Sequence, residues 1–176
     1  WYIDPIDGTK SFVHGAPLYT NLLGLMRDDE TIVGIIQIPA LGQQLSAAKD
    51  LGAHLNGRRV QASRIDDLSK AVMVMTDQRD MEQKAVNQNW RRLYEKCRFV
   101  RTWGDAYGYF MVATGRAEIM LDEVVEPYDL APLPVILREA GGAFFDWKGQ
   151  ETIFGGNGAA SNAALKQTVV ETLASG

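Results

Sequence analysis

The chain opens with the segment WYIDPIDGT (residues 1–9), which places two carboxylates directly after an apolar run. The run is typical of a buried strand, and Pro5 is expected to end the ladder of that strand because proline has no amide hydrogen. Asp7 then returns a second carboxylate towards Asp4, with the main-chain carbonyl of Ile6 between them. Carboxylate and carbonyl oxygens are the ligands that hard cations such as Mg²⁺ prefer, so this turn is a candidate metal site.

Gly8 and Thr9 continue the turn with a flexible residue and a hydroxyl, where a short helix is expected to begin. Free amides at the start of a helix bind phosphate oxygens, so the segment combines a place for a cation with a place for phosphate. Asp, Pro, Gly and Thr also form ordinary solvated turns, and that interpretation stays open for the segment taken alone.

The composition predicts one soluble globular unit, because the 176 residues are 46% hydrophobic and 23% charged. A net charge of −4 argues against a nucleic-acid-binding protein that depends on a basic surface. Cys97 is the single cysteine and cannot form an internal disulfide, so a reducing, cytoplasmic setting is expected. The sequence has no apolar run long enough to cross a membrane, so neither a membrane nor a nucleic acid is expected as a partner.

The patterning changes near residue 66 and predicts an α/β protein in two halves. Residues 1–66 combine the acidic turn with an antiparallel meander of short strands over 21–60, which ends in a hairpin around Asn56-Gly57. Residues 67–176 alternate strands and helices and form the second, α/β half. The strands predicted there are 71–76, 98–101, 117–122 and 143–147, and the first two helices are 81–97 and 105–114.

Asp129 is predicted to be the N-cap of a further helix that ends at Glu139-Ala140, where Gly141-Gly142 supplies a stop. Pro134 removes one helical hydrogen bond and is expected to distort the start of this helix. From these residues alone, a plain capping role for Asp129 is the simpler interpretation.

Taken together, the segments WYIDPIDGTKSFVHG and YDLAPLPVILREAGG resemble the two signature regions of the inositol monophosphatase superfamily. The first resembles the pattern W-x-(I/V)-D-P-(I/L)-D-G-T-x-x-F-x-x-G over its whole length. The second resembles W-D-x-A-x-x-x-x-(I/L)-x-x-E-A-G-G, with Tyr128 in place of the usual Trp. Within the superfamily, Pro-Tyr-Asp at this position and the block RTWGDAYGYFMVATGRAEIMLD are most similar to histidinol-phosphate phosphatases.

The resemblance implies a layered αβαβα sandwich and Mg²⁺-dependent hydrolysis of a small phosphate monoester by a metal-activated water. It implies that the amides of Gly8 and Thr9 hold phosphate oxygens and that the Thr9 hydroxyl orients the water, so Thr9 and Asp4 are the catalytic candidates. The metal ligands that it implies are Asp4, the carbonyl of Ile6, Asp7 and Asp129.

The resemblance also implies a substrate-binding region formed by Gly104, Asp105, Asp122 and Glu126. Carboxylates at Asp105 and Asp122 suit the ammonium of an aminoalcohol such as histidinol, which favours L-histidinol phosphate, an intermediate of histidine biosynthesis. Structural roles remain open, since Asp105 could cap its helix and Asp122 could end its strand. The alternative substrates are inositol-1-phosphate or another sugar phosphate. The alternatives of another class are a metal- or phosphate-binding fragment without catalysis and a purely structural domain.

The chain lacks an initiator Met, and it contains neither the upstream helices nor the Glu-rich metal-ligand motif of the family. We interpret it as an N-terminally truncated member whose sandwich lacks its N-terminal helices. The apolar face of the meander is then expected to be exposed or covered in a homodimer. The isolated chain is expected to be weakly active or inactive.

Overall fold

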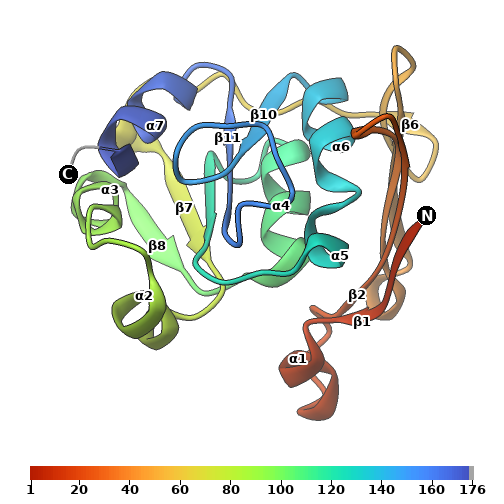
Figure 1. Cartoon of the computed structure of the whole chain (residues 1–176), viewed down its shortest axis with the longest axis horizontal. Helices are drawn as coiled ribbons and strands as arrows, with labels where there is room; N and C mark the ends of the chain where they lie inside the picture. The colour runs from red at the N-terminus through yellow and green to blue at the C-terminus, as the bar shows by residue number, and fades with distance from the viewer. Residues whose placement is uncertain (175–176) are drawn as a thin grey trace.

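The computed structural model, which describes residues 1–174, contains two β-sheets with helices between and beyond them (Figure 1). Sheet A is antiparallel throughout, and its strands follow one another in chain order. Its strands are β1 (Tyr2–Asp7), β2 (Thr20–Arg27), β3 (Glu30–Ile38), β4 (Gln43–Ala48), β5 (Gly52–Leu55) and β6 (Arg58–Arg59). The meander predicted over residues 21–60 is confirmed, and Asn56 and Gly57 form the last turn with positive φ angles.

Sheet B has the order β10-β11-β9-β7-β8 and mixes parallel and antiparallel pairs. Strand β7 runs parallel to β8 and β9, whereas β11 runs antiparallel to β9 and β10. These strands are β7 (Val72–Met75), β8 (Phe99–Arg101), β9 (Ile119–Asp122), β10 (Gly142–Phe145) and β11 (Gly158–Asn162). The four strands predicted in this half are confirmed, and β11, which is built of small and polar residues, is additional.

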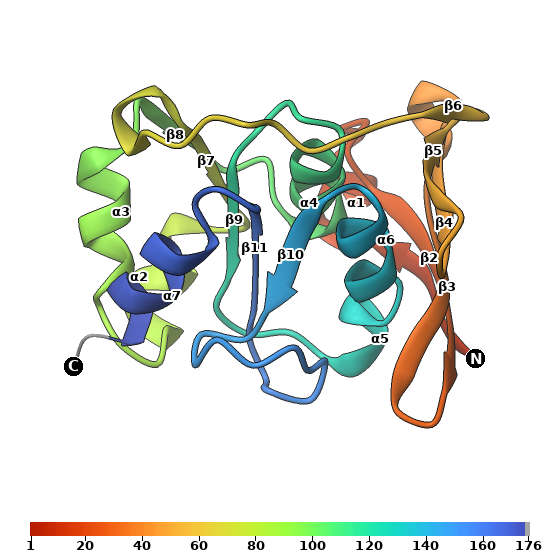
Figure 2. The same cartoon turned by 90° about the horizontal axis from the view of Figure 1, so that it is seen from above.

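The helices form two layers, one between the sheets and one beyond sheet B (Figure 2). The helices between the sheets are α4 (Asp105–Ala113), α5 (Pro127–Leu130) and α6 (Leu133–Glu139). Those beyond sheet B are α2 (Gln78–Lys84), α3 (Trp90–Lys96) and α7 (Lys166–Ala174). The remaining short elements are α1 (Thr9–Val13) and two 3₁₀ turns, Pro39–Leu41 and Leu68–Lys70.

The order of layers is therefore sheet A, helices, sheet B, helices, which is the predicted αβαβα sandwich without its N-terminal helical layer. The division of the chain into halves at residues 66 and 67 stays a prediction. None of the helices within residues 1–174 is long and apolar enough to span a lipid bilayer.

Two hydrophobic clusters hold the layers together. The cluster between the sheets joins side chains from both halves of the chain, including Leu22, Ile36, Phe110 and Val135. The second cluster packs Trp90 and its neighbours against the far face of sheet B. Because the first cluster is shared, the position of sheet A relative to sheet B is fixed by apolar packing rather than by a linker.

The single helix predicted over residues 81–97 is wrong, because α2 and α3 are separate helices on either side of residues 85–89. The side-chain amides of Asn87 and Asn89 both donate to the carbonyl of Leu173, at 3.1 Å each. The main-chain amide of Asn89 also donates to Oδ1 of Asn87. Asparagine side chains that bond outside the helix compete with the helical ladder, and here they end it.

The predicted N-cap role of Asp129 is also wrong. Asp129 is the third residue of α5, whose N-cap is Glu126. The Asp129 carboxylate accepts a hydrogen bond from the amide of Glu126 at 2.9 Å, so it caps from within the first turn. The predicted helix is divided at Ala131-Pro132 into α5 and α6.

The outer face of sheet A is apolar. Alternation along β2 and β3 directs Leu22 and Ile36 into the core, so Leu23 and Ile35 project outward. Leu23 and Ile35 are directly paired across the two strands, and Ile3 of β1 follows in the same row with 63% of its surface exposed. This arrangement provides the apolar face that the sequence predicted.

We predict that the 19.5 kDa chain self-associates through this outer face. Ile35→Lys is expected to shift the protein to a monomer, because it places a charge in the centre of the apolar row. Gln37→Lys is the matched control, since Gln37 is already polar and exposed on the same strand. Light scattering after size exclusion measures the mass, and a monomeric unsubstituted chain would contradict the prediction.

Candidate active site

The acidic turn is built on a β-bulge in an edge strand. Asp4 pairs with Leu22 and Asp7 pairs with Thr20, so three steps along β1 match two steps along β2. The strand thus continues past Pro5, and the prediction that Pro5 ends the ladder is wrong. A proline is tolerated here because β1 is an edge strand and the bulge leaves one residue unpaired.

Asp7 is buried and anchored from two directions. Its Oδ2 accepts a hydrogen bond from the Thr20 hydroxyl at 2.7 Å and one from the Ala106 amide at 2.9 Å. The Ala106 amide belongs to the first turn of α4, where the positive end of the helix dipole favours an anion. This pair of contacts ties the turn of sheet A to the second half of the chain.

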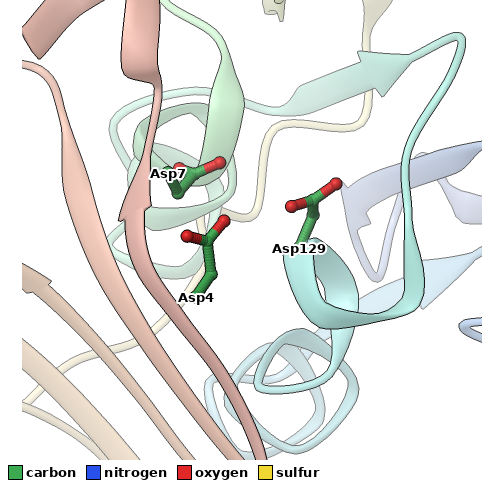
Figure 3. Close-up of side chains that lie close together, drawn as sticks. All are labelled: Asp4, Asp7 and Asp129. Carbon is green, nitrogen blue, oxygen red and sulfur yellow. The ribbon is translucent and has the colours of Figure 1, made fainter.

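Three carboxylates meet across the two halves (Figure 3). Asp4 and Asp7 lie on β1, and Asp129 faces them from α5. Oxygens of the three side chains all lie within 4.8 Å of one another, although Asp129 is far from the other two in sequence. The structure therefore brings together the three carboxylates of the predicted metal site.

The electrostatics of this cluster favour a positive partner. Burial, followed by the charge of Asp105, raises the pKa of Asp7 from 3.8 to about 7. Burial, together with the neighbouring Asp4, raises the pKa of Asp129 to about 6. Burial is the larger cause of both shifts, and neighbouring carboxylates add to it, so a cation beside these groups would favour their ionised forms.

The turn after Asp7 forms the expected helix start. Gly8 has a φ of 73° and is the N-cap of α1, and a Cβ at this position would lie 3.0 Å from the Asp105 carboxylate. The Thr9 hydroxyl donates to the carbonyl of Ile6 at 3.2 Å. The predicted carbonyl ligand of Ile6 thus lies within hydrogen-bond reach of the predicted catalytic hydroxyl.

A cavity of about 560 Å³ opens over the three carboxylates. Its lining includes Gly8, Thr9 and three of the four predicted substrate-binding residues, which are Gly104, Asp105 and Asp122. Glu126 is exposed at the start of α5 and is not among the lining residues. Asp122 ends β9 as expected, and burial raises the pKa of its carboxyl well above the ordinary value.

Comparison with known proteins identifies the family of the chain and gives the same fold. The sequence profile described as the inositol monophosphatase family matches residues 1–175. The chain belongs to the inositol monophosphatase family. It is 38% identical to a histidinol-phosphatase of Chlorobaculum parvum and 32% identical to one of Mycobacterium tuberculosis, covering all of this chain and 68% and 70% of those proteins.

Among solved structures, an inositol monophosphatase from Zymomonas mobilis superposes with a TM-score of 0.90 at 26% identity. The match covers 98% of this chain and 69% of that one. The chain thus spans about two thirds of the length of these family members. They are named as phosphatases, so the family places the chain among the phosphoric monoester hydrolases.

Thr76 also lines the cavity, and the sequence analysis did not identify it. Its hydroxyl accepts a hydrogen bond from the Asp105 amide at 2.9 Å and donates to Asp122. It directly follows β7, and Asp122 ends the neighbouring parallel strand β9. Because the carboxyl ends of parallel strands meet at one edge, a polar residue after the apolar run VMVM was the signal that could have identified Thr76.

Lys10 was also missed. It is the one lysine or arginine among the described residues that line the cavity, and its ammonium lies 3.8 Å from the Asp77 carboxylate. Its position directly after Gly8-Thr9 was the available signal, since a cation beside a candidate phosphate-binding turn has an evident electrostatic role.

We predict that the metal-free protein loses stability as pH rises from about 4 to about 7. Asp7 has a pKa of about 7 when folded and 3.8 as its ordinary value, so between these values only the folded chain keeps the proton. Asp7→Asn is expected to make stability less dependent on pH over this range. Saturating Mg²⁺ is expected to have the same effect on the unsubstituted chain. Calorimetric melting in a chelator at pH 5 and pH 8 measures this as a difference of several degrees. The same change of melting temperature between pH 5 and pH 8 in Asp7→Asn and in the unsubstituted chain would contradict the prediction.

Proposed function

We propose that this chain carries the active site of an enzyme for the Mg²⁺-dependent hydrolysis of a small phosphate monoester, with L-histidinol phosphate as the substrate. The observation that carries the proposal is the convergence of Asp4, Asp7 and Asp129 in a cavity that Gly8 and Thr9 also line. Asp105 and Asp122 line the same cavity, where a cationic substrate would contact them.

The residues present fit a hard divalent cation. All the candidate ligand atoms are oxygens, and the three carboxylates lie within 4.8 Å of one another. The raised pKa values of Asp7 and Asp129 support the fit, because a bound cation would favour the ionised carboxylates that burial disfavours. Asp4, Asp7, Asp129 and the Ile6 carbonyl are the proposed ligands.

When bound, the metal neutralises phosphate charge and lowers the pKa of a coordinated water. The chain itself positions the reactants. The amides of Gly8 and Thr9, at the start of α1, donate to phosphate oxygens, and the Lys10 ammonium adds positive charge on the same side. The Thr9 hydroxyl orients the attacking water. The water oxygen bonds to phosphorus as the bond between phosphorus and the ester oxygen breaks, and a proton from the water passes to the ester oxygen, which leaves as the alcohol.

Asp105 and Asp122 favour an ammonium on the leaving alcohol. Asp105 and Asp122 share the Thr76 hydroxyl, through the Asp105 amide and the Asp122 carboxylate respectively. A neutral polyol would bring no positive charge to these carboxyls, whereas an ammonium favours their ionised forms. The similarity to two proteins named histidinol-phosphatase supports the same choice.

The second candidate is an inositol-phosphate or other sugar-phosphate phosphatase, which the fold similarity to the Zymomonas mobilis protein supports. Phosphate release from L-histidinol phosphate and from inositol-1-phosphate, with Mg²⁺ and with a chelator, distinguishes the two. Faster release from histidinol phosphate supports the proposal, and faster release from inositol-1-phosphate supports the second candidate. Metal binding without turnover of either compound would favour the non-catalytic alternative.

We predict that Asp4→Asn, Asp7→Asn and Asp129→Asn each lower phosphate release about 100-fold or more. Each substitution removes one anionic metal ligand at nearly constant shape, and metal stabilisation of the transition state amounts to several kcal/mol. Asp66→Asn is the matched control, because Asp66 is exposed and does not line the cavity. Retention of full activity by all three variants would overturn the metal-dependent mechanism.

We predict that Asp105→Asn raises KM for L-histidinol phosphate about tenfold and changes KM for inositol-1-phosphate much less. Asp105 has a φ of 52°, a left-handed conformation that asparagine tolerates well, so the variant removes charge without adding backbone strain. One charge pair in a half-buried site accounts for an effect of this size. Equal changes of KM for the two substrates would show that Asp105 does not select a cation.

A further inference from the structure

The junction between α5 and α6 rests directly on the backbone of sheet A. Gly24 of β2 and Gly34 of β3 are paired opposite each other beneath Ala131 and Pro132. A Cβ on Gly24 would lie 2.8 Å from the carbonyl carbon of Ala131, and a Cβ on Gly34 would lie still closer to the carbonyl oxygen of Pro132. Contacts this short do not occur between real side chains and backbone, so both positions need glycine for the approach.

A side chain on the same strand fixes the junction in place. The Thr31 hydroxyl is buried and donates to the Ala131 carbonyl at 2.9 Å. Pro134 has no amide hydrogen and cannot donate to the Leu130 carbonyl, so the helical hydrogen-bond ladder is interrupted beside the junction. The two glycines allow the α5–α6 junction to approach sheet A closely, and the hydrogen bond from Thr31 orients the junction on the sheet.

The docked junction lies only two residues after Asp129. Helix α5 has four residues and packs against β1 and β2, so it has little structure of its own to hold Asp129 towards Asp4. A displacement at Ala131 therefore moves the Asp129 carboxylate relative to the two acids of β1.

We propose that Gly24, Gly34 and Thr31 are positioning residues for the metal site, which set the distance from Asp129 to the carboxylates of β1. The inference rests on the proposed function, because it assigns these residues to the assembly of the same site. A positioning role differs from a role in packing alone. If these residues served only packing, their substitution would lower stability without a selective loss of metal affinity.

The test is a titration of the chain with Mn²⁺, an oxygen-preferring stand-in for Mg²⁺, in which electron paramagnetic resonance reports the free ion. Gly24→Ala and Gly34→Ala are expected to weaken Mn²⁺ binding about tenfold or more, as loss of a supporting shell does at other metal sites. Thr31→Val, which adds no volume, is expected to weaken it in the same direction with the fold retained.

Gly142→Ala is the matched control, because its new Cβ would lie 2.9 Å from the Ser161 carbonyl oxygen in sheet B, away from the metal ligands. Melting temperatures are measured on every variant. Comparable loss of stability in Gly24→Ala and Gly142→Ala, with weaker Mn²⁺ binding only in the former, supports the inference.

Unchanged Mn²⁺ affinity in folded Gly24→Ala and Thr31→Val, with an unsubstituted chain that binds, would overturn the positioning role and leave the proposed function intact. An unsubstituted chain without saturable Mn²⁺ binding would overturn the metal-dependent function and this inference together.

Discussion

Repulsion among three carboxylates within 4.8 Å is the constraint around which this structure is organised. The fold opposes it with fixed donors: Asp7 accepts from Thr20 and from an amide at the start of α4, and Asp129 accepts from the amide of Glu126. These hydrogen bonds do not offset burial and the neighbouring negative charges, since the pKa of Asp7 remains raised to about 7. A preformed cluster that still favours positive charge is suited to capturing a cation without rearrangement.

The cluster can exist only because the two sheets share one core. Asp4 and Asp7 belong to sheet A, whereas Asp129 and the amide that anchors Asp7 belong to the helical layer. Phe110 of α4 and Val135 of α6 pack in the same cluster as Leu22 and Ile36 of sheet A. Apolar burial has no directional requirement, and it holds the two sheets and the helices between them rigidly together. The short polar contacts then orient the carboxylates.

The parts of the fold that follow from local patterns were predictable. The alternation along residues 21–60 identified the meander, and apolar runs identified four strands of sheet B. The break between α2 and α3 was not predictable, because it depends on Asn87 and Asn89 reaching Leu173 at the far end of the chain. The meeting of Asp129 with Asp4 likewise has no local signal, and only the resemblance to a known family predicted it.

The wrong prediction for Pro5 shows how the acidic turn works. In a regular strand, residues three apart point to opposite faces, so an unbroken β1 would separate Asp4 from Asp7. One extra residue between them, with Asp4 opposite Leu22 and Asp7 opposite Thr20, reverses that parity and turns both carboxylates to the same side. Proline suits the extra position because it has no amide hydrogen to leave unpaired. The spacing of the two acids therefore places both carboxylates on one side of the strand, and the proline between them is compatible with the bulge that this requires.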